Sequence, residues 1–416
     1  MRRTAQGPVR LLLPFLVCLL AACHANYPAL FDRDLISDDA MQNGICLVHG
    51  QLLVGPELTR VDDGDLCFKG NVILSLGPHG TVQIPDGAVQ WDVHGATVLP
   101  GLVDTHVHVL VTEAPPWEFR LPDPEHNLEA WLWSGITTAF DMGGTPDDLQ
   151  QLRQKIADRE ILGPQIFFCH EPISAPDGHP IPAITSILPW PIENLLATTV
   201  PVIENADEAS EIVADADHLV HGVYREAIST AVIDAARDRS VTITYTAAPF
   251  DNTRLMSLGR YQPPVGATHL SDPELVAAVS GESGGRFGEL PVLGDFSRGI
   301  ASTQILEDNI RRLHEAGVVV LVGTDSPIAG VFPGLSFHEE LRFLACAGIP
   351  ADALVRRVTV LGARLLSNAP GFGILEVGAR ADVLVVNGDP MLNIEALQDI
   401  VHVFAAGIPL NRIVAE

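Results

Sequence analysis

The stretch from Thr97 to His108 constrains the fold more than any other part of this sequence. It reads Thr-Val-Leu-Pro-Gly-Leu-Val-Asp-Thr-His-Val-His, and residues 98–103 are mostly apolar and β-prone. This composition predicts one short buried strand. Asp104, His106 and His108 follow at every second position, so they point to the same side of the chain. Two imidazoles on one face at the end of a buried strand are a natural pair of metal ligands. The alternative is two histidines hydrogen-bonded in a polar loop.

The segment from Leu99 to His108 also resembles the first barrel strand of the amidohydrolase superfamily. Three later segments resemble the same family in the same order. They are Val320–Ser326, similar to the last barrel strand with its catalytic aspartate, Gly373–Val386, similar to the return into a small β-domain, and Val403–Pro409, similar to the closing strand. Local similarity is to the imidazolonepropionase/prolidase-like and N-acetylglucosamine-6-phosphate deacetylase branches. The resemblance implies an α/β fold, a (β/α)8 TIM-like barrel with a small β-sandwich domain built from N- and C-terminal segments.

The domain boundaries follow from this resemblance and from the alternation of strand and helix patterns. We expect a signal peptide at residues 1–22, the first part of the β-sandwich at 43–98, the hydrolase barrel at 99–370 and the second part of the sandwich at 371–416. Ile45–Val54 and Asp65–Leu76 are expected strands of the small domain. Eight strand–helix units are expected in the barrel, with Gly266–His269 as the sixth strand and Leu290–Leu293 as the seventh.

The N-terminus has the pattern of an export signal. A basic start with Arg2, Arg3 and Arg10 precedes the apolar run Leu11–Leu20, which is too short for a comfortable transmembrane helix. Cys23 directly follows Leu-Ala-Ala, which resembles a bacterial lipoprotein signal with a lipidated first mature residue. We therefore expect a protein of the bacterial cell envelope, lipid-anchored to the membrane at Cys23, with its domain in the periplasm or outside. The alternative is an ordinary cleaved signal peptide.

Charge and cysteine content narrow the partners and the compartment. The chain has 25 Lys and Arg against 52 Asp and Glu, a formal net charge of −27, which argues against nucleic acid and anionic membrane surfaces as partners. A small-molecule substrate is what the family resemblance implies. The oligomeric state stays open. Export implies an oxidising compartment, where Cys46 and Cys67 on two candidate strands could pair, although spacing alone cannot fix connectivity. Cys169 and Cys346 lie in apolar runs and are expected in the core.

The resemblance implies metal-assisted hydrolysis, in which a divalent ion activates water and polarises the scissile carbonyl. Asp325, in Gly-Thr-Asp-Ser-Pro, fits the aspartate that moves the proton and also binds metal; its alternative is a helix-capping or turn residue. His106 and His108 are the firmest metal ligands. His269, in Gly-Ala-Thr-His-Leu, resembles the sixth-strand histidine of the deacetylases and would complete the metal site or polarise the carbonyl. A loop histidine is the alternative.

Strands four and five depart from the commonest pattern of the family. Many relatives bridge two metals with a carboxylated lysine, but no lysine follows Lys155 in this chain. His221 is a possible ligand on strand four, with a core or loop histidine as the equal alternative, and Glu171 could supply the missing carboxylate. The usual strand-five histidine falls near Thr244 or Tyr245. We therefore expect a mononuclear site holding one divalent ion, most simply Zn2+.

Two further residues are candidates for substrate contact, and the substrate itself stays unnamed. His179 lies in a proline-rich loop, where a plain surface role is the alternative, and Tyr245 lies near the expected fifth strand. The resemblance predicts a hydrolase acting on a C–N bond in an amide, a cyclic amide or a dipeptide-like molecule. The losses at strands four and five motivate the main alternative, a catalytically weakened lipoprotein with a binding or scaffolding role. A single-metal deaminase is a third option.

Overall fold

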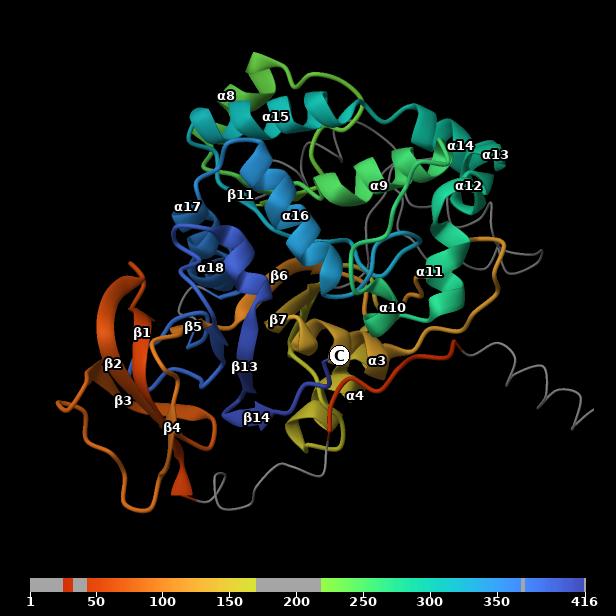
Figure 1. Cartoon of the computed structure of the whole chain (residues 1–416). Helices are drawn as coiled ribbons and strands as arrows, with labels where there is room; N and C mark the ends of the chain where they lie inside the picture. The colour runs from red at the N-terminus through yellow and green to blue at the C-terminus, as the bar shows by residue number, and fades with distance from the viewer. Residues whose placement is uncertain (1–24, 33–42, 170–217, 368–370, 415–416) are drawn as a thin grey trace, which may run out of the picture.

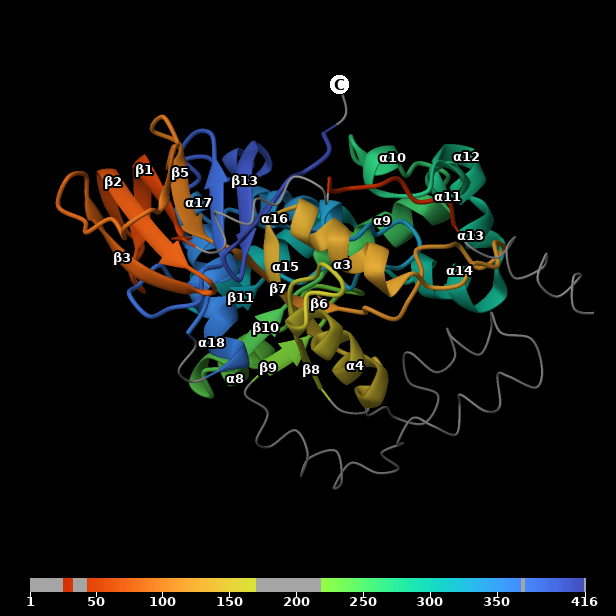
Figure 2. The same ribbon diagram turned by 90° about the horizontal axis from the view of Figure 1, so that it is seen from below.

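We describe the computed structural model of the chain over residues 25–32, 43–169, 218–367 and 371–414 (Figure 1). The expected signal peptide with Cys23, and the candidates Glu171 and His179, lie outside the described residues. Within the described part, no helix combines the length and the apolar character needed to cross a membrane. Figure 2 shows an eight-stranded sheet at one end of the molecule, the helices α10–α14 at the other, and parallel strands between them.

The eight-stranded sheet joins segments from both ends of the chain. Its order is β14-β13-β12-β5-β1-β2-β3, and β4 pairs with β1. The strands are β1 Ile45–Val54, β2 Thr59–Lys69, β3 Val72–Pro78, β4 Val89–Asp92, β5 Thr97–Pro100, β12 Val383–Val386, β13 Ile400–Ala405 and β14 Ile408–Leu410. Phe68 packs edge-on against Phe404 in the core of this sheet. The aromatic contact thus links the N-terminal and C-terminal parts of one domain.

The cysteines fit the sequence expectation in part. Cys46 and Cys67 are opposite each other on β1 and β2 and form a disulfide, so the expected pairing is confirmed. Cys169 is half-buried, whereas Cys346 is exposed at the end of a helix. The expectation of a core position for Cys346 is wrong, because the helix buries a different face, which includes Leu341 and Leu344.

The stretch from Thr97 to His108 forms two strands instead of the expected one. β5 belongs to the eight-stranded sheet, and β6, Leu102–Val107, begins a separate parallel sheet. Gly101 lies between them, and a Cβ atom there would be 2.1 Å from Oγ1 of Thr137. The chain therefore changes sheets at a position where only glycine fits the close approach.

Two three-stranded parallel sheets carry the candidate ligands. One has the order β6-β7-β8 and the other β11-β10-β9. The further strands are β7 Ile136–Asp141, β8 Gln165–Phe168, β9 His218–Val220, β10 Thr242–Thr244 and β11 Val320–Leu321. The chain after β11 joins the two sheets, because Thr105 N donates to Val322 O at 3.0 Å and His108 N donates to Ser326 O at 2.8 Å.

The expected sixth and seventh strands are helices in the structure. Residues 266–269 lie at the start of α10, Ala267–Leu270, and residues 290–293 lie at the start of α14, Pro291–Arg298. Pro291 occupies the first turn of α14, where its missing N–H costs nothing. Four-residue apolar runs cannot be assigned by periodicity alone. As a result, β10 pairs directly with β11 in the described residues.

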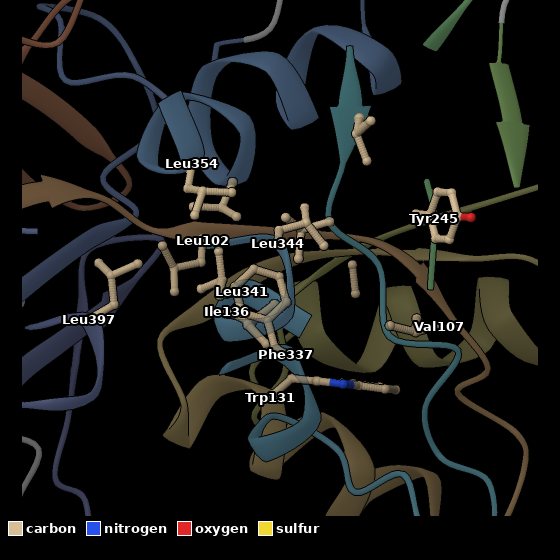
Figure 3. Packing of buried hydrophobic residues seen from close by; sticks show 14 of the residues in the cluster. Leu102, Val107, Trp131, Ile136, Tyr245, Phe337, Leu341, Leu344, Leu354 and Leu397 are labelled. Atoms are coloured by element: carbon tan, nitrogen blue, oxygen red, sulfur yellow. The ribbon is translucent and has the colours of Figure 1, made fainter. Parts of the chain in front are cut away.

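The remaining helices surround these strands (Figures 1 and 2). They are α3 Pro124–Trp133, α4 Pro146–Ala157, α8 Thr230–Asp238, α9 Ala247–Ser257, α11 Pro273–Val279, α12 Gly281–Gly284, α13 Arg286–Glu289, α15 Thr303–Glu315, α16 Leu335–Cys346, α17 Ala351–Arg356 and α18 Gly362–Leu366, with a π-helix at Arg357–Leu361 and a 3-10 helix at Ile394–Gln398. Figure 3 shows the main core, in which Trp131 of α3, Ile136 of β7 and Phe337 of α16 belong to one cluster.

Candidate active site

His106, His108 and Asp325 form a cluster where β6 ends and where the chain leaves β11. The Oδ1 atom of Asp325 lies 2.8 Å from Nε2 of His108 and 3.1 Å from Nε2 of His106. The two Nε2 atoms are 3.3 Å apart. The three groups could hold one metal ion, and their side chains are largely buried. We call these three residues the strand-end cluster.

Asp104 aligns the two segments that supply this cluster. Its Oδ1 atom accepts hydrogen bonds from the amides of His106, at 3.2 Å, and Thr324, at 3.1 Å. Its Oδ2 atom accepts from the Thr324 hydroxyl at 2.8 Å. Because one buried carboxylate binds both segments, it fixes their register and brings Asp325 opposite the two histidines.

His221 stands beside the strand-end cluster, just after β9. Its ring centroid is 4.7 Å from that of His106, and its Nδ1 atom lies 2.9 Å from Oγ1 of Thr246. The single hydroxyl proton of Thr246 is donated to the carbonyl of Tyr245 at 2.7 Å, so this oxygen accepts a hydrogen bond from the Nδ1–H group of His221. A neutral His221 then carries its lone pair on Nε2, the state that a metal ligand requires.

His218 and Thr244 form a hydroxyl network next to the strand-end cluster. Thr105 donates to Val322 O at 2.9 Å and lies 2.7 Å from Oγ1 of Thr244, which in turn lies 3.1 Å from Nε2 of His218. Nδ1 of His218 lies 2.7 Å from Oγ1 of Thr242. Both ring nitrogens therefore have hydroxyl partners. Burial, together with the charge of His106, lowers the pKa of His218 to about 4, so this ring is neutral and supports its neighbours.

The backbone at the ends of three parallel strands is left-handed. His221 after β9, Thr246 after β10 and Asp325 after β11 have φ values of +61°, +55° and +59°. This conformation is uncommon for residues other than glycine and is an outlier for a β-branched threonine. Such strain clusters at functional sites. Here it occurs at three neighbouring strand ends, each at a residue that faces the same group of polar side chains.

The electrostatics of the site keep its aspartates in different states. Burial alone would raise the pKa of Asp325, but the charge of His106 and the hydrogen bonds from His106 and His108 hold it well below its usual range. Burial lowers the pKa of His108, but its hydrogen bond and charge interaction with Asp325 outweigh burial and leave the pKa raised. Burial raises the pKa of Asp104 to about 7, despite its hydrogen bonds from Thr324 and His106. Asp325 is therefore the ionised carboxylate of the group.

The donor atoms of the strand-end cluster fit a divalent metal ion. The Nε2 atoms of His106 and His108 face each other, and two neutral imidazoles can place lone pairs there only if a proton or a cation lies between them. Nδ1 of His106 is buried without a hydrogen-bond partner. Two imidazoles and one carboxylate match the set of protein ligands in one class of catalytic zinc sites. His221 lies beside this group, with its ring centroid 4.7 Å from that of His106, but it is not one of the three residues whose ligand atoms converge.

Two candidates from the sequence lie elsewhere. His269 is in α10, and its Nε2 donates to the carbonyl of Ile413 at 2.7 Å while its ring contacts Trp133. Tyr245 is fully buried and belongs to the main core, in which Figure 3 labels it, and its hydroxyl donates to Val223 O at 2.6 Å. Both assignments need correction, because the expected sixth strand is a helix and the Tyr245 side chain has no surface for a substrate.

Three residues of the site had no role assigned from the sequence. Asp104 belongs to the Asp-x-His-x-His pattern, and its spacing from Thr324 carried no signal of their contact. His218 lies three residues before His221, so the sequence showed a second histidine in the expected fourth strand. Its presence alone did not indicate which role that histidine has. Thr246 offers no sequence signal, since its role depends on a left-handed backbone.

Comparisons with known proteins indicate which family this chain resembles. A model of the amidohydrolase family matches residues 97–280 and 289–410. The chain is 25% identical over 390 residues to a 5-methylthioadenosine/S-adenosylhomocysteine deaminase of Syntrophobacter fumaroxidans, covering 82% of this chain and 84% of that protein. It is also 25% identical to an imidazolonepropionase of Pseudomonas aeruginosa over 374 residues, 80% of this chain and 90% of that protein.

Solved structures share the fold at low sequence identity. A prolidase in complex with N-methylphosphonate-L-proline aligns with a TM-score of 0.61 at 18% identity, over 89% of this chain and 100% of that one. Molinate hydrolase aligns with a TM-score of 0.58 at 17% identity, over 90% of this chain and 95% of that one.

Proposed function

The chain belongs to the amidohydrolase family, and on this premise we propose that it is a metal-dependent hydrolase that cleaves a carbon–nitrogen bond in a small molecule. The observation that carries the proposal is the convergence of Nε2 of His106, Nε2 of His108 and Oδ1 of Asp325 within hydrogen-bonding distance of one another. Two imidazoles and an ionised carboxylate at the ends of parallel strands suit hydrolytic chemistry better than a scaffolding role.

The residues of the site would have different roles in metal binding, proton transfer and positioning. His106 and His108 would hold one divalent ion, with Asp325 or His221 completing its ligands; Zn2+ suits this donor set. Such an ion, when bound, acidifies a water molecule and polarises the substrate carbonyl. The carboxylate of Asp325 would accept a proton from the attacking water and return it to the leaving nitrogen. Thr246 would hold the tautomer of His221, and Asp104 would hold the register of the two segments.

We propose an amide, a cyclic amide or a dipeptide-like substrate. The names of similar proteins support this class, since they include an imidazolonepropionase and a prolidase. The second candidate is a deaminase, because one of the relatives that is 25% identical is a 5-methylthioadenosine/S-adenosylhomocysteine deaminase. The oligomeric state is not part of the proposal.

The architecture and location form a separate part of the proposal. We infer a closed barrel, in the manner of a (β/α)8 fold, in which β8 and β9 complete the wall. Its support is the parallel pairing that runs from β8 through β6, the segment 322–326 and β11 to β9. We also propose export and lipid anchoring at Cys23, on the pattern of the N-terminal sequence. A Cys23→Ala variant should leave the membrane fraction, and an unchanged distribution would reject the anchor.

Metal content and a substrate screen test the enzymatic proposal. We expect about one divalent ion per chain at the strand-end cluster, lost in a His106→Ala/His108→Ala variant. The metal-loaded chain should hydrolyse a member of an amide, cyclic amide and dipeptide library, and the double variant should not. Ammonia release from an aminated heterocycle would favour the deaminase instead. A folded chain that binds no metal at this cluster and is inactive in both screens would support the scaffolding alternative.

A further inference from the structure

A second group of potential metal ligands lies on the eight-stranded sheet. His49 comes from β1, Asp63 from β2, and His79 directly follows β3. One ligand atom from each lies within 4.8 Å of the other two. Nδ1 of His49 is 3.2 Å from Oδ1 of Asp63, and the two imidazole centroids are 3.9 Å apart. We call these three residues the sheet cluster.

His79 is held by a buried carboxylate in the orientation of a metal ligand. Its Nδ1 atom lies 2.9 and 3.1 Å from the two oxygens of Asp65, a residue with 1% of its surface exposed. An ionised carboxylate only accepts, so Nδ1 of His79 carries the proton and the lone pair of the neutral ring is on Nε2. A carboxylate behind the ring fixes its tautomer and makes it a better donor, as in carboxylate–histidine–metal arrangements.

An irregularity in the backbone of β1 accompanies the position of His49 next to Asp63 and His79. His49 has a φ of +58°, and the pairing of β1 with β2 is irregular between Leu47 and Gly50. Such bulges redirect a side chain that a regular strand would point elsewhere. The amide of His49 also donates to Oδ1 of Asp65 at 3.3 Å, so one buried carboxylate supports both histidines. The Cys46–Cys67 disulfide lies in the adjacent part of the same strand pair.

Pairwise ion pairs explain this cluster less well than a shared cation. If each histidine were protonated by its own aspartate, two positive rings would stand with their centroids 3.9 Å apart and repel each other. A bound cation lets both rings stay neutral and donate lone pairs, while Asp63 balances the charge. Imidazole donors favour Zn2+, Cu2+ or Ni2+, whereas Ca2+ and Mg2+ prefer oxygen ligands alone.

We propose that His49, Asp63 and His79 bind a divalent transition-metal ion, with Zn2+ as the test case. This site is separate from the strand-end cluster and goes beyond the proposed hydrolase function. The ion would connect β1, β2 and the turn after β3 at the outer part of the sheet. Its role would therefore be structural, and loss of the site should leave catalysis intact.

Zinc titration of the full chain with the disulfide intact tests the proposal. In a His106→Ala/His108→Ala background, which removes the strand-end ligands, the metal-stripped chain should bind one Zn2+ in calorimetry. Adding His49→Gln and His79→Gln should weaken that binding by more than the about 10- to 100-fold that loss of an outer-shell partner costs, because both changes remove direct ligands. His94→Gln is the matched control, since His94 is an exposed histidine paired with Asp92 after β4, and it should leave the titration unchanged.

Two results would overturn the proposal. One is a folded His106→Ala/His108→Ala chain that takes up no Zn2+. The other is equal binding with and without the His49→Gln and His79→Gln changes. If a multiple variant does not fold, imidazole NMR signals of the unmodified chain decide: saturating Zn2+ should shift those of His49 and His79, and unmoved signals would reject the site. Failure of the hydrolase proposal is read separately, from activity and from metal at the strand-end cluster.

Discussion

The strand-end cluster and the sheet cluster each contain two histidines and one aspartate but lie in different surroundings. In the first, the side chains of His106 and Asp325 are 2% and 15% exposed. In the second, those of His49 and Asp63 are 44% and 61% exposed. Both clusters have a buried aspartate behind them, Asp104 in one and Asp65 in the other. Each cluster thus has a supporting carboxylate of its own, and the two clusters differ in how deeply their candidate ligands are buried.

Burial of the ligands decides which of the two clusters can perform chemistry. Interactions between charged groups are much stronger where water is excluded, and a buried site can hold reacting groups in fixed positions. The strand-end cluster meets both conditions because parallel strands end there. The sheet cluster is screened by solvent and can bind an ion without controlling a reaction.

Replacing the aspartate of each cluster by asparagine should give the largest difference in kcat between the two clusters. Asp325→Asn removes the proposed proton acceptor and should lower kcat by about 10²- to 10⁴-fold, the usual contribution of general acid–base catalysis. Asp63→Asn makes the same chemical change in the sheet cluster and should leave kcat within about twofold. Steady-state kinetics on the substrate found in the library screen measure both. Equal losses in the two variants would contradict the distinction.

The disulfide should matter for stability and not for activity. Cys46 and Cys67 are separated by 21 positions, and closing a loop of this size stabilises a protein by roughly 3 kcal/mol in the chain-entropy model. We expect Cys46→Ala/Cys67→Ala to lower the free energy of unfolding by about that amount in urea denaturation. The kcat should stay unchanged because the strand-end cluster is built on other sheets. A large loss of kcat in the folded variant would show that the two regions are coupled.

Thr246 tests whether a hydroxyl group controls the tautomer of His221. Thr246→Ala removes the acceptor for Nδ1 and should weaken metal affinity by about 10- to 100-fold, as for other outer-shell partners of ligating histidines. Thr246→Ser keeps the hydroxyl and should restore most of the affinity. Competition with a chromophoric chelator measures both variants. If serine and alanine weaken binding equally, the hydroxyl has no such role.

The sequence predicted the parts of the site that depend on local pattern. His106 and His108 alternate after an apolar run, and Asp325 follows another; the structure brings these three side chains together. The long strand Ile45–Val54 was also predicted with its observed bounds. Strong periodicity and buried apolar runs are local properties, so they can be interpreted without the fold.

The rest depends on contacts that sequence patterns do not contain. Gly101 divides one apparent strand between two sheets because Thr137 packs against it. His269 followed a family-like motif, but a four-residue window could not separate strand from helix. The sheet cluster had no signal either, since its residues come from three separate segments and a bulge at His49 brings one of them into line.

The smallest effect concerns the titration of His79 in the metal-free chain. Its hydrogen bond to Asp65, opposed by desolvation and reinforced by the charge of Asp65, raises the pKa of His79 above 6.5. Because the folded-state pKa is raised, its stabilising contribution is present below about pH 6.5 and is lost as the pH rises through the folded-state pKa. Asp65→Asn removes the charge and should lower the pKa of His79 toward its ordinary value, which NMR titration of the ring measures. An unchanged pKa would mean that the buried carboxylate does not control this ring, and the support that Asp65 gives to the sheet cluster would then be limited to its contact with the amide of His49.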